Sequence, residues 1–118
     1  MKSVSWDVAF RKLNEWRERE SFITVGPVYE MEDEHGETIE MHWGSSGDVV
    51  LSADPTTGVL SMRWEGEINL VGASFRAGDW DDLPFDERGL GPEQYESALE
   101  VTFPDGRMLI LAQDWPLG

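Results

Sequence analysis

Cysteine is absent from the sequence and basic residues are scarce, since only nine of the 118 residues are Lys or Arg. The lack of Cys excludes disulfides, thiolate catalysis, and zinc or iron–sulfur sites with Cys ligands. Charged residues recur from Lys2 onward, so the chain shows no apolar segment of a secretory signal. No run approaches the roughly 18 apolar residues of a membrane span. These absences predict a cytoplasmic protein that contacts no membrane.

The few basic residues face 24 Asp and Glu, which gives a net charge of −15. Residues 1–19 hold five basic and three acidic residues, whereas residues 20–118 hold four basic and 21 acidic ones. Such a surface repels phosphate backbones, so we expect no nucleic-acid partner. It favours solubility and fast association with a basic protein partner.

One amphipathic helix is expected near the N-terminus, over residues 5–19. The apolar residues recur at the i, i+3, i+4, i+7 spacing of one helical stripe. They are Trp6, Ala9, Phe10, Leu13 and Trp16. Ser3 or Ser5 can cap the first turn, and Asp7 faces the positive end of the helix. The stripe predicts that the helix packs on a core within the same domain.

After the helix, the apolar period changes to two residues, which is typical of strands. Strands are expected over residues 22–31, 38–43, 49–53, 59–65, 68–75, 95–103 and 108–113. Gly26–Pro27 predicts a bulge or an edge position in the first strand, because Pro donates no ladder hydrogen bond. Leu60, Met62 and Trp64 are expected to point inward. Residues 44–48 are expected to form a loop.

One helix followed by six to seven antiparallel strands in hairpins predicts an α+β fold in a single domain, residues 1–118. Short hairpins and frequent Gly favour a strongly bent sheet or a half-open small barrel, with an element order loosely similar to the SH3 and Sm layouts. A cystatin-like open sheet wrapped on the helix is the alternative. The turn at 54–58 carries no signature of Sm-type RNA reading.

Residues 77–94 break the strand pattern and predict a long loop rich in Gly, Pro and acidic residues. Loops longer than about 12–15 residues in a compact domain are often functional. Aromatic residues in an acidic loop can anchor a basic partner, or they can fold back over the core. The predicted partner-binding residues are Asp79, Trp80, Asp81, Asp82, Phe85, Asp86 and Glu87.

Catalytic and metal-binding candidates are few. His42 and Glu40 fall on one face of the strand expected over 38–43, which is how a metal site or an acid–base pair could begin. This pair carries one hypothesis, a small metal-dependent enzyme. The acids of 77–94 do not match the ligand spacing of an EF-hand loop, and no serine triad or phosphate loop is present. We expect no metal and no cofactor.

The leading hypothesis is a non-enzymatic acidic interaction domain, similar to immunity or inhibitor proteins, that binds a basic protein through 77–94. A second hypothesis is a small-ligand module with a pocket between helix and sheet, lined by Trp43, Trp64 and Phe75. Self-association is also open, because an exposed strand edge such as that with Gly26–Pro27 could pair between two copies in a homodimer.

Overall fold

The computed structural model of the chain describes residues 2–32, 34–42, 45–79, 85–86 and 95–114. Within them, one helix, α1 (Trp6–Glu18), accompanies eleven strands. The strands are β1 (Lys2–Val4), β2 (Ile23–Glu32), β3 (Thr38–His42), β4 (Ser45–Asp48), β5 (Val50–Asp54), β6 (Val59–Met62), β7 (Gly66–Asn69), β8 (Ser74–Asp79), β9 (Phe85–Asp86), β10 (Tyr95–Thr102) and β11 (Met108–Asp114). The α+β class with an N-terminal helix is confirmed.

The one strand expected over 68–75 is two, β7 and β8, which lie in different sheets. Three further strands, β1, β4 and β9, were not expected from the sequence. They have two to four residues each, which is too short for an apolar period to show. Residues 45–48 therefore form a strand and not the expected loop, because β2 supplies a partner edge for them.

Helix α1 begins and ends close to the predicted bounds. The Ser5 side chain caps it by accepting a hydrogen bond from the Val8 N–H at 3.2 Å, and Asp7 lies in the first turn. Four members of the predicted stripe are buried, Ala9, Phe10, Leu13 and Trp16, and the fifth, Trp6, is partly buried against the same core. This burial holds α1 against the core, so the amphipathic pattern has the structural meaning that we expected.

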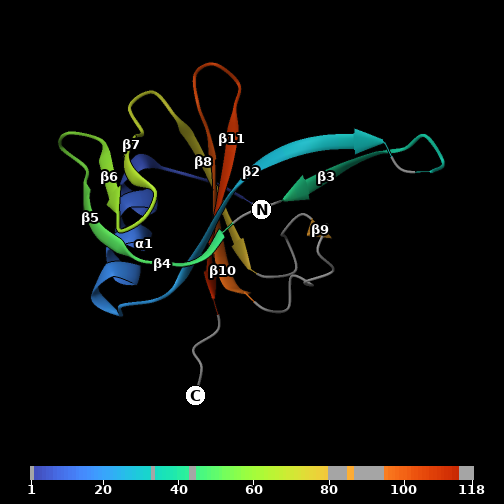
Figure 1. Ribbon diagram of the computed structural model, residues 1–118. Coiled ribbons are helices and arrows are strands. Elements are labelled where there is room, and N and C mark those ends of the chain that lie inside the picture. Colours follow the sequence, from blue (N-terminus) through green and yellow to red (C-terminus); the bar gives the residue numbers. More distant parts are fainter. Residues whose placement is uncertain (1, 33, 43–44, 80–84, 87–94, 115–118) are drawn as a thin grey trace.

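The strands form two sheets, and neither closes into a barrel over the described residues (Figure 1). The large sheet has the order β1–β8–β10–β11–β2–β3–β9, with β4 also paired to β2. Its pairs are antiparallel except for β3 with β9, which is parallel. The small sheet has the order β5–β6–β7.

Strand β2 lies inside the large sheet, which corrects the expected edge position at Gly26–Pro27. The Asp114 N–H donates to the Phe22 carbonyl. Because backbone groups alternate along an antiparallel strand, the N–H and C=O groups of the even-numbered residues of β2 point toward β11. The nitrogen of Pro27 therefore points to the other side. On that side the partner of β2 changes from β4, at Val25, to β3, at Val28. Pro27 is tolerated because its missing N–H falls at this change. A homodimer through this strand is therefore not supported, although self-association stays a prediction.

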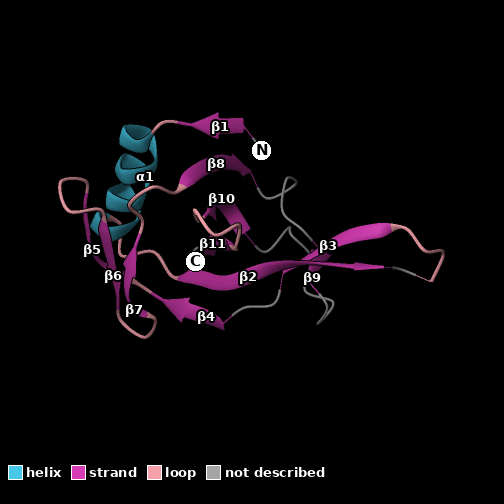
Figure 2. Cartoon of the chain, turned by 90° about the horizontal axis from the view of Figure 1, so that it is seen from above, coloured by secondary structure: helices cyan, strands magenta, loops and turns pink. Residues whose placement is uncertain are grey.

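The main core lies where α1 and the two sheets meet (Figure 2). Leu13 of α1, Leu60 of β6 and Leu99 of β10 are all 0% exposed. Burying a side chain of this size contributes roughly 1.5–3 kcal/mol. A second cluster, formed by Ala98, Ile110 and Ala112, lies apart from the main core. Among the described residues, no helix has the length and apolar character needed to cross a membrane.

Candidate functional site

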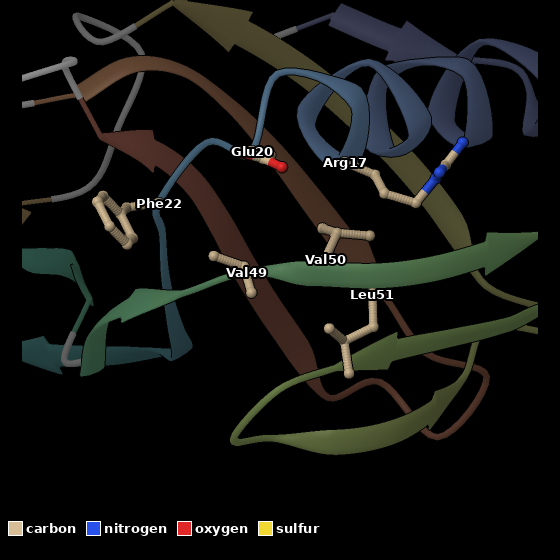
Figure 3. Close-up of a pocket in the computed structure, with 6 residues that line it drawn as sticks. All are labelled: Arg17, Glu20, Phe22, Val49, Val50 and Leu51. Atoms are coloured by element: carbon tan, nitrogen blue, oxygen red, sulfur yellow. The ribbon is translucent and has the colours of Figure 1, made fainter.

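A groove opens between the C-terminal end of α1 and strand β5 (Figure 3). It has a volume of about 400 Å³ and is lined by Arg17, Glu20, Phe22, Val49, Val50 and Leu51. Phe22 and Leu51 are exposed over 51% and 55% of their surfaces. Two exposed apolar side chains beside one groove are typical of a binding surface.

The end of α1 shapes one side of the groove. The Ser21 N–H donates to the Trp16 carbonyl at 3.0 Å, and the Glu20 N–H donates to the Arg17 carbonyl at 3.2 Å. This is the bonding of a Schellman motif, in which the residue after the C-cap takes a left-handed conformation that is usually given to Gly. Glu20 takes it here, with φ of 53°. This conformation costs an L-residue roughly 1 kcal/mol, so Glu20 destabilises the end of α1 relative to Gly at the same position.

Strand β5 shapes the other side, with the edge that does not pair with β6. At the C-terminal end of β5, side chains of α1 cover this edge and the turn that follows. Asn14 Nδ2 donates to the Ala53 carbonyl at 3.0 Å, and Trp6 Nε1 donates to the Pro55 carbonyl at 3.1 Å. Figure 3 shows Val50, at the other end of β5, and Val49 just before it, across from Arg17 and Glu20 at the end of the helix. One end of the edge is therefore covered by helix side chains, and the other end faces the groove.

Val50 lines the groove, and its backbone N–H and C=O are directed away from β6. The Arg63 N–H donates to the Val49 carbonyl at 3.2 Å, so Val49 and Arg63 form the hydrogen-bonded pair. The next pair, Val50 with Met62, is then of the other type, in which both peptide groups point away from the partner strand. Val50 is only 5% exposed. Its N–H and C=O are thus directed away from β6 within a nearly buried residue.

A buried carboxylate fixes the strand end at the groove. Asp48 is 2% exposed and accepts three backbone hydrogen bonds, from the N–H groups of Val49 at 2.8 Å, Trp64 at 3.0 Å and Glu65 at 3.1 Å. These bonds tie the end of β4 to the turn between β6 and β7. Arg63 adds a bond from Nη2 to the Gly47 carbonyl at 2.7 Å. The groove is therefore built on a braced backbone.

The structure gives the predicted pocket residues different surroundings. Phe75 is buried in the core, where its ring meets Trp6 and Phe10 at centroid distances of 5.9 Å and 6.5 Å. Trp64 is 63% exposed, with the Arg63 guanidinium 4.4 Å from its ring centre. The expected inward direction of Trp64 is wrong, because β6 ends at Met62 and the turn follows. Trp43 lies outside the described residues.

Of the predicted partner-binding region 77–94, the structure describes five residues. Ala77–Asp79 extend β8 and pair with β10, so this end of the expected loop is a strand. Phe85–Asp86 form β9 beside β3. Trp80, Asp81, Asp82 and Glu87 lie outside the described residues, and the binding role of 77–94 stays a prediction.

The histidine hypothesis receives only backbone evidence. His42 pairs with Val28 and Glu40 pairs with Glu30 in the register of β3 and β2. Among the described residues, no group of three or more His, Asp or Glu side chains is placed to hold a metal ion. The metal-dependent enzyme thus stays a prediction on these two residues.

Two further carboxylates lie in the large sheet, and the sequence did not single them out. Glu100 is 3% exposed and accepts a bond from Arg76 Nη1 at 3.2 Å. Asp114 accepts a bond from the Thr24 hydroxyl at 2.8 Å. Burial raises the pKa of the Asp114 carboxyl, although the Thr24 hydrogen bond opposes the rise. Each acid has a polar partner among the described residues, so both are explained as parts of the sheet.

Sequence reasoning also missed the groove itself. One signal was present: residues 49–53 are apolar on both faces, so one of the two faces could lack a buried partner, and Leu51 is exposed. The approach of α1 to β5 could not be read from the sequence. No protein-family model, curated protein or solved structure matches the chain.

Proposed function

We propose that the chain is a non-enzymatic acidic interaction domain that binds another protein with a basic surface, as immunity and inhibitor proteins do. One observation carries the proposal: exposed Phe22 and Leu51 flank a groove in a chain of net charge −15. Apolar side chains in such positions supply binding energy at protein interfaces, and surrounding acids raise the association rate with a basic partner.

The charges at the end of α1 are mixed. Arg17 is engaged within the helix, because its Nε donates to Asn14 Oδ1 at 3.2 Å and its Nη2 lies 3.9 Å from Glu18 Oε1. The Glu18 side chain is 71% exposed, and Arg19 and Glu20 are exposed as well. The excess negative charge that favours a basic partner therefore belongs to residues 20–118 as a whole. A partner segment with Lys or Arg next to an apolar residue complements it.

The acidic region 77–94 remains the second candidate surface for the same function. Its sequence interleaves aromatic and acidic residues, which is the composition that the partner requires. The two surfaces make different predictions for mutation, so one experiment separates them.

The test uses the tagged full chain to retain partners from an extract of its own organism, followed by reconstitution with the purified partner. We expect the affinity of wild type to fall at least tenfold between about 50 mM and 500 mM salt, because exposed charges are screened. Phe22→Ser with Leu51→Ser should weaken binding if the groove is the interface. Asp79→Asn with Asp81→Asn and Asp82→Asn should weaken it if 77–94 is.

Val71→Ser is the matched control, since Val71 is a 58% exposed apolar residue that does not line the groove. It should bind as wild type does. The proposal is wrong if no protein is retained, or if every variant binds as tightly as wild type. If the binding ignores salt, the electrostatic part of the proposal is wrong.

The groove volume favours a second candidate function, a small-ligand module. Ligand pockets commonly span roughly 300–1,000 Å³ and are mostly apolar, and the groove of about 400 Å³ falls in this range. A thermal-shift screen of apolar acids and amines would test it. A compound that raises the Tm of wild type but not of Leu51→Ser supports this function, and the absence of any such compound contradicts it.

A further inference from the structure

We infer that the partner enters the groove as an extended segment that adds a strand to the open end of β5 at Val50. This inference rests on the proposed function and specifies how the partner is recognised. The occupant is a segment of another protein with an apolar residue flanked by Lys or Arg. Strand addition is a common mode of peptide recognition, in which backbone bonds give affinity and side-chain pockets give specificity.

The first support is the backbone of Val50. Its N–H and C=O point away from β6, and the residue is 5% exposed. Buried backbone groups are almost always paired, because leaving one unpaired destabilises the fold. Among the described residues, α1 donates to the Ala53 carbonyl but not to Val50. An extended segment offers one acceptor and one donor, which match the N–H and C=O that Val50 directs away from β6.

The second support is the boundary of the open edge. Asn14 bonds the Ala53 carbonyl at 3.0 Å and blocks pairing at that end of β5. A register shift between Val50 and Ser52 marks a bulge, which also limits how far a partner strand can continue. The added strand therefore makes a short contact centred on Val50. This residue supplies one pair of backbone bonds.

The third support is the arrangement of side chains around Val50. Phe22 and Leu51 give an apolar side chain of the partner a surface to pack on, and Glu20 offers a carboxylate at the end of the helix. The net charge of −15 favours Lys or Arg in the flanks of that segment. A second copy of this chain carries the same negative charge, which disfavours it as the occupant.

The experiment selects random dodecapeptides displayed on phage against the immobilised full chain. Enriched peptides are synthesised, and their affinity is measured by fluorescence anisotropy. We expect an apolar residue flanked by Lys or Arg, and a loss of at least tenfold when one backbone amide at the centre is N-methylated. N-methylation of the amide next to it, which points away from β5, should change affinity less than threefold.

Two variants of the chain complete the test. Val50→Pro removes the outward N–H, a change that an edge strand tolerates because the ladder on the other side is kept. It should lower peptide affinity at least tenfold, while Val71→Ser should leave it unchanged. If Val50→Pro fails to fold, hydrogen exchange of the Val50 amide in wild type decides instead. Bound peptide should slow that exchange at least tenfold.

The outcomes separate this inference from the proposed function. If selected peptides tolerate N-methylation throughout and leave Val50 exchange unchanged, strand addition is wrong while protein binding stands. If no peptide is enriched but the natural partner still binds in a salt-dependent way, the inference alone fails. If neither binds, both fail. If Val50 becomes protected with rising concentration of the chain alone, the occupant is a second copy and the inference is overturned.

Discussion

The two ends of strand β5 share one sheet edge, but among the described residues helix side chains bond to only one of them, which we call the covered end; the other, at the groove, is the open end. At the end near Ala53, side chains of the first three turns of α1 donate to backbone carbonyls of the edge. At the end near Val50, the helix has already ended and a groove replaces it. The difference teaches that edge protection in this fold depends on where α1 stops. The Schellman motif at Glu20 therefore helps determine where along β5 the groove lies.

The largest effect is expected for Asp48→Ala, which removes the brace behind the open end. Three backbone N–H groups lose their carboxylate acceptor, and each such bond contributes roughly 1.5–3 kcal/mol. The cost of burying the carboxylate offsets part of this contribution. We therefore expect the free energy of unfolding to fall by about 4 kcal/mol. Urea unfolding measures it. Asp54→Ala, which removes an acceptor from the Thr56 N–H, should cost about 1 kcal/mol. Equal losses in the two variants would contradict the brace.

The next effect concerns the covered end. Gly58→Ala places a Cβ 2.6 Å from Val71 Cγ2 and 3.0 Å from the Trp6 ring, at φ of 77°. Overpacking and the left-handed conformation together should cost about 3 kcal/mol. Gly66→Ala has the same φ and no atom within 4 Å, so it isolates the conformational cost at about 1 kcal/mol. Thermal unfolding compares the two, and a similar Tm for both would show that Val71 and Trp6 move aside without cost.

Asn14→Ala should open the covered end directly. The Ala53 carbonyl, in a residue only 7% exposed, loses its donor, so we expect a loss of about 2 kcal/mol. Glu15→Ala is the control, because this neighbouring side chain is exposed on α1 and should change stability by less than about 0.5 kcal/mol. If Asn14→Ala lowers the free energy of unfolding no more than the control does, the hydrogen bond to Ala53 does not stabilise the covered end of β5.

The smallest effect has the opposite sign. Glu20→Gly relieves the left-handed conformation at the end of α1 and should stabilise the fold by about 0.5–1 kcal/mol. Glu20→Ala keeps the conformational cost and should not stabilise, so chemical denaturation of the pair separates backbone from charge. If Glu20→Gly also weakens partner binding, the Glu20 side chain contributes to binding at the open end of β5 despite its conformational cost.

Local sequence signals determined much of the fold. The apolar stripe and the Ser5 cap fix α1 because both act within a few turns of one helix. The alternation in 95–103 and 108–113, with Pro104 and Gly106 between them, gives the β10–β11 hairpin for the same reason. The charge of −15 is also a property of the sequence alone. These features need no partner from elsewhere in the chain.

Only the tertiary structure decided the rest, because those features depend on contacts between distant residues. β1 and β4 are strands because β8 and β2 offer edges to them. The buried carboxylate of Asp48 acts through backbone groups 16 and 17 residues away. The groove depends on where α1 ends relative to Val50, a residue some 30 positions further along the chain. The sequence by itself determined an acidic α+β protein, and packing alone decided which edge of it stays open.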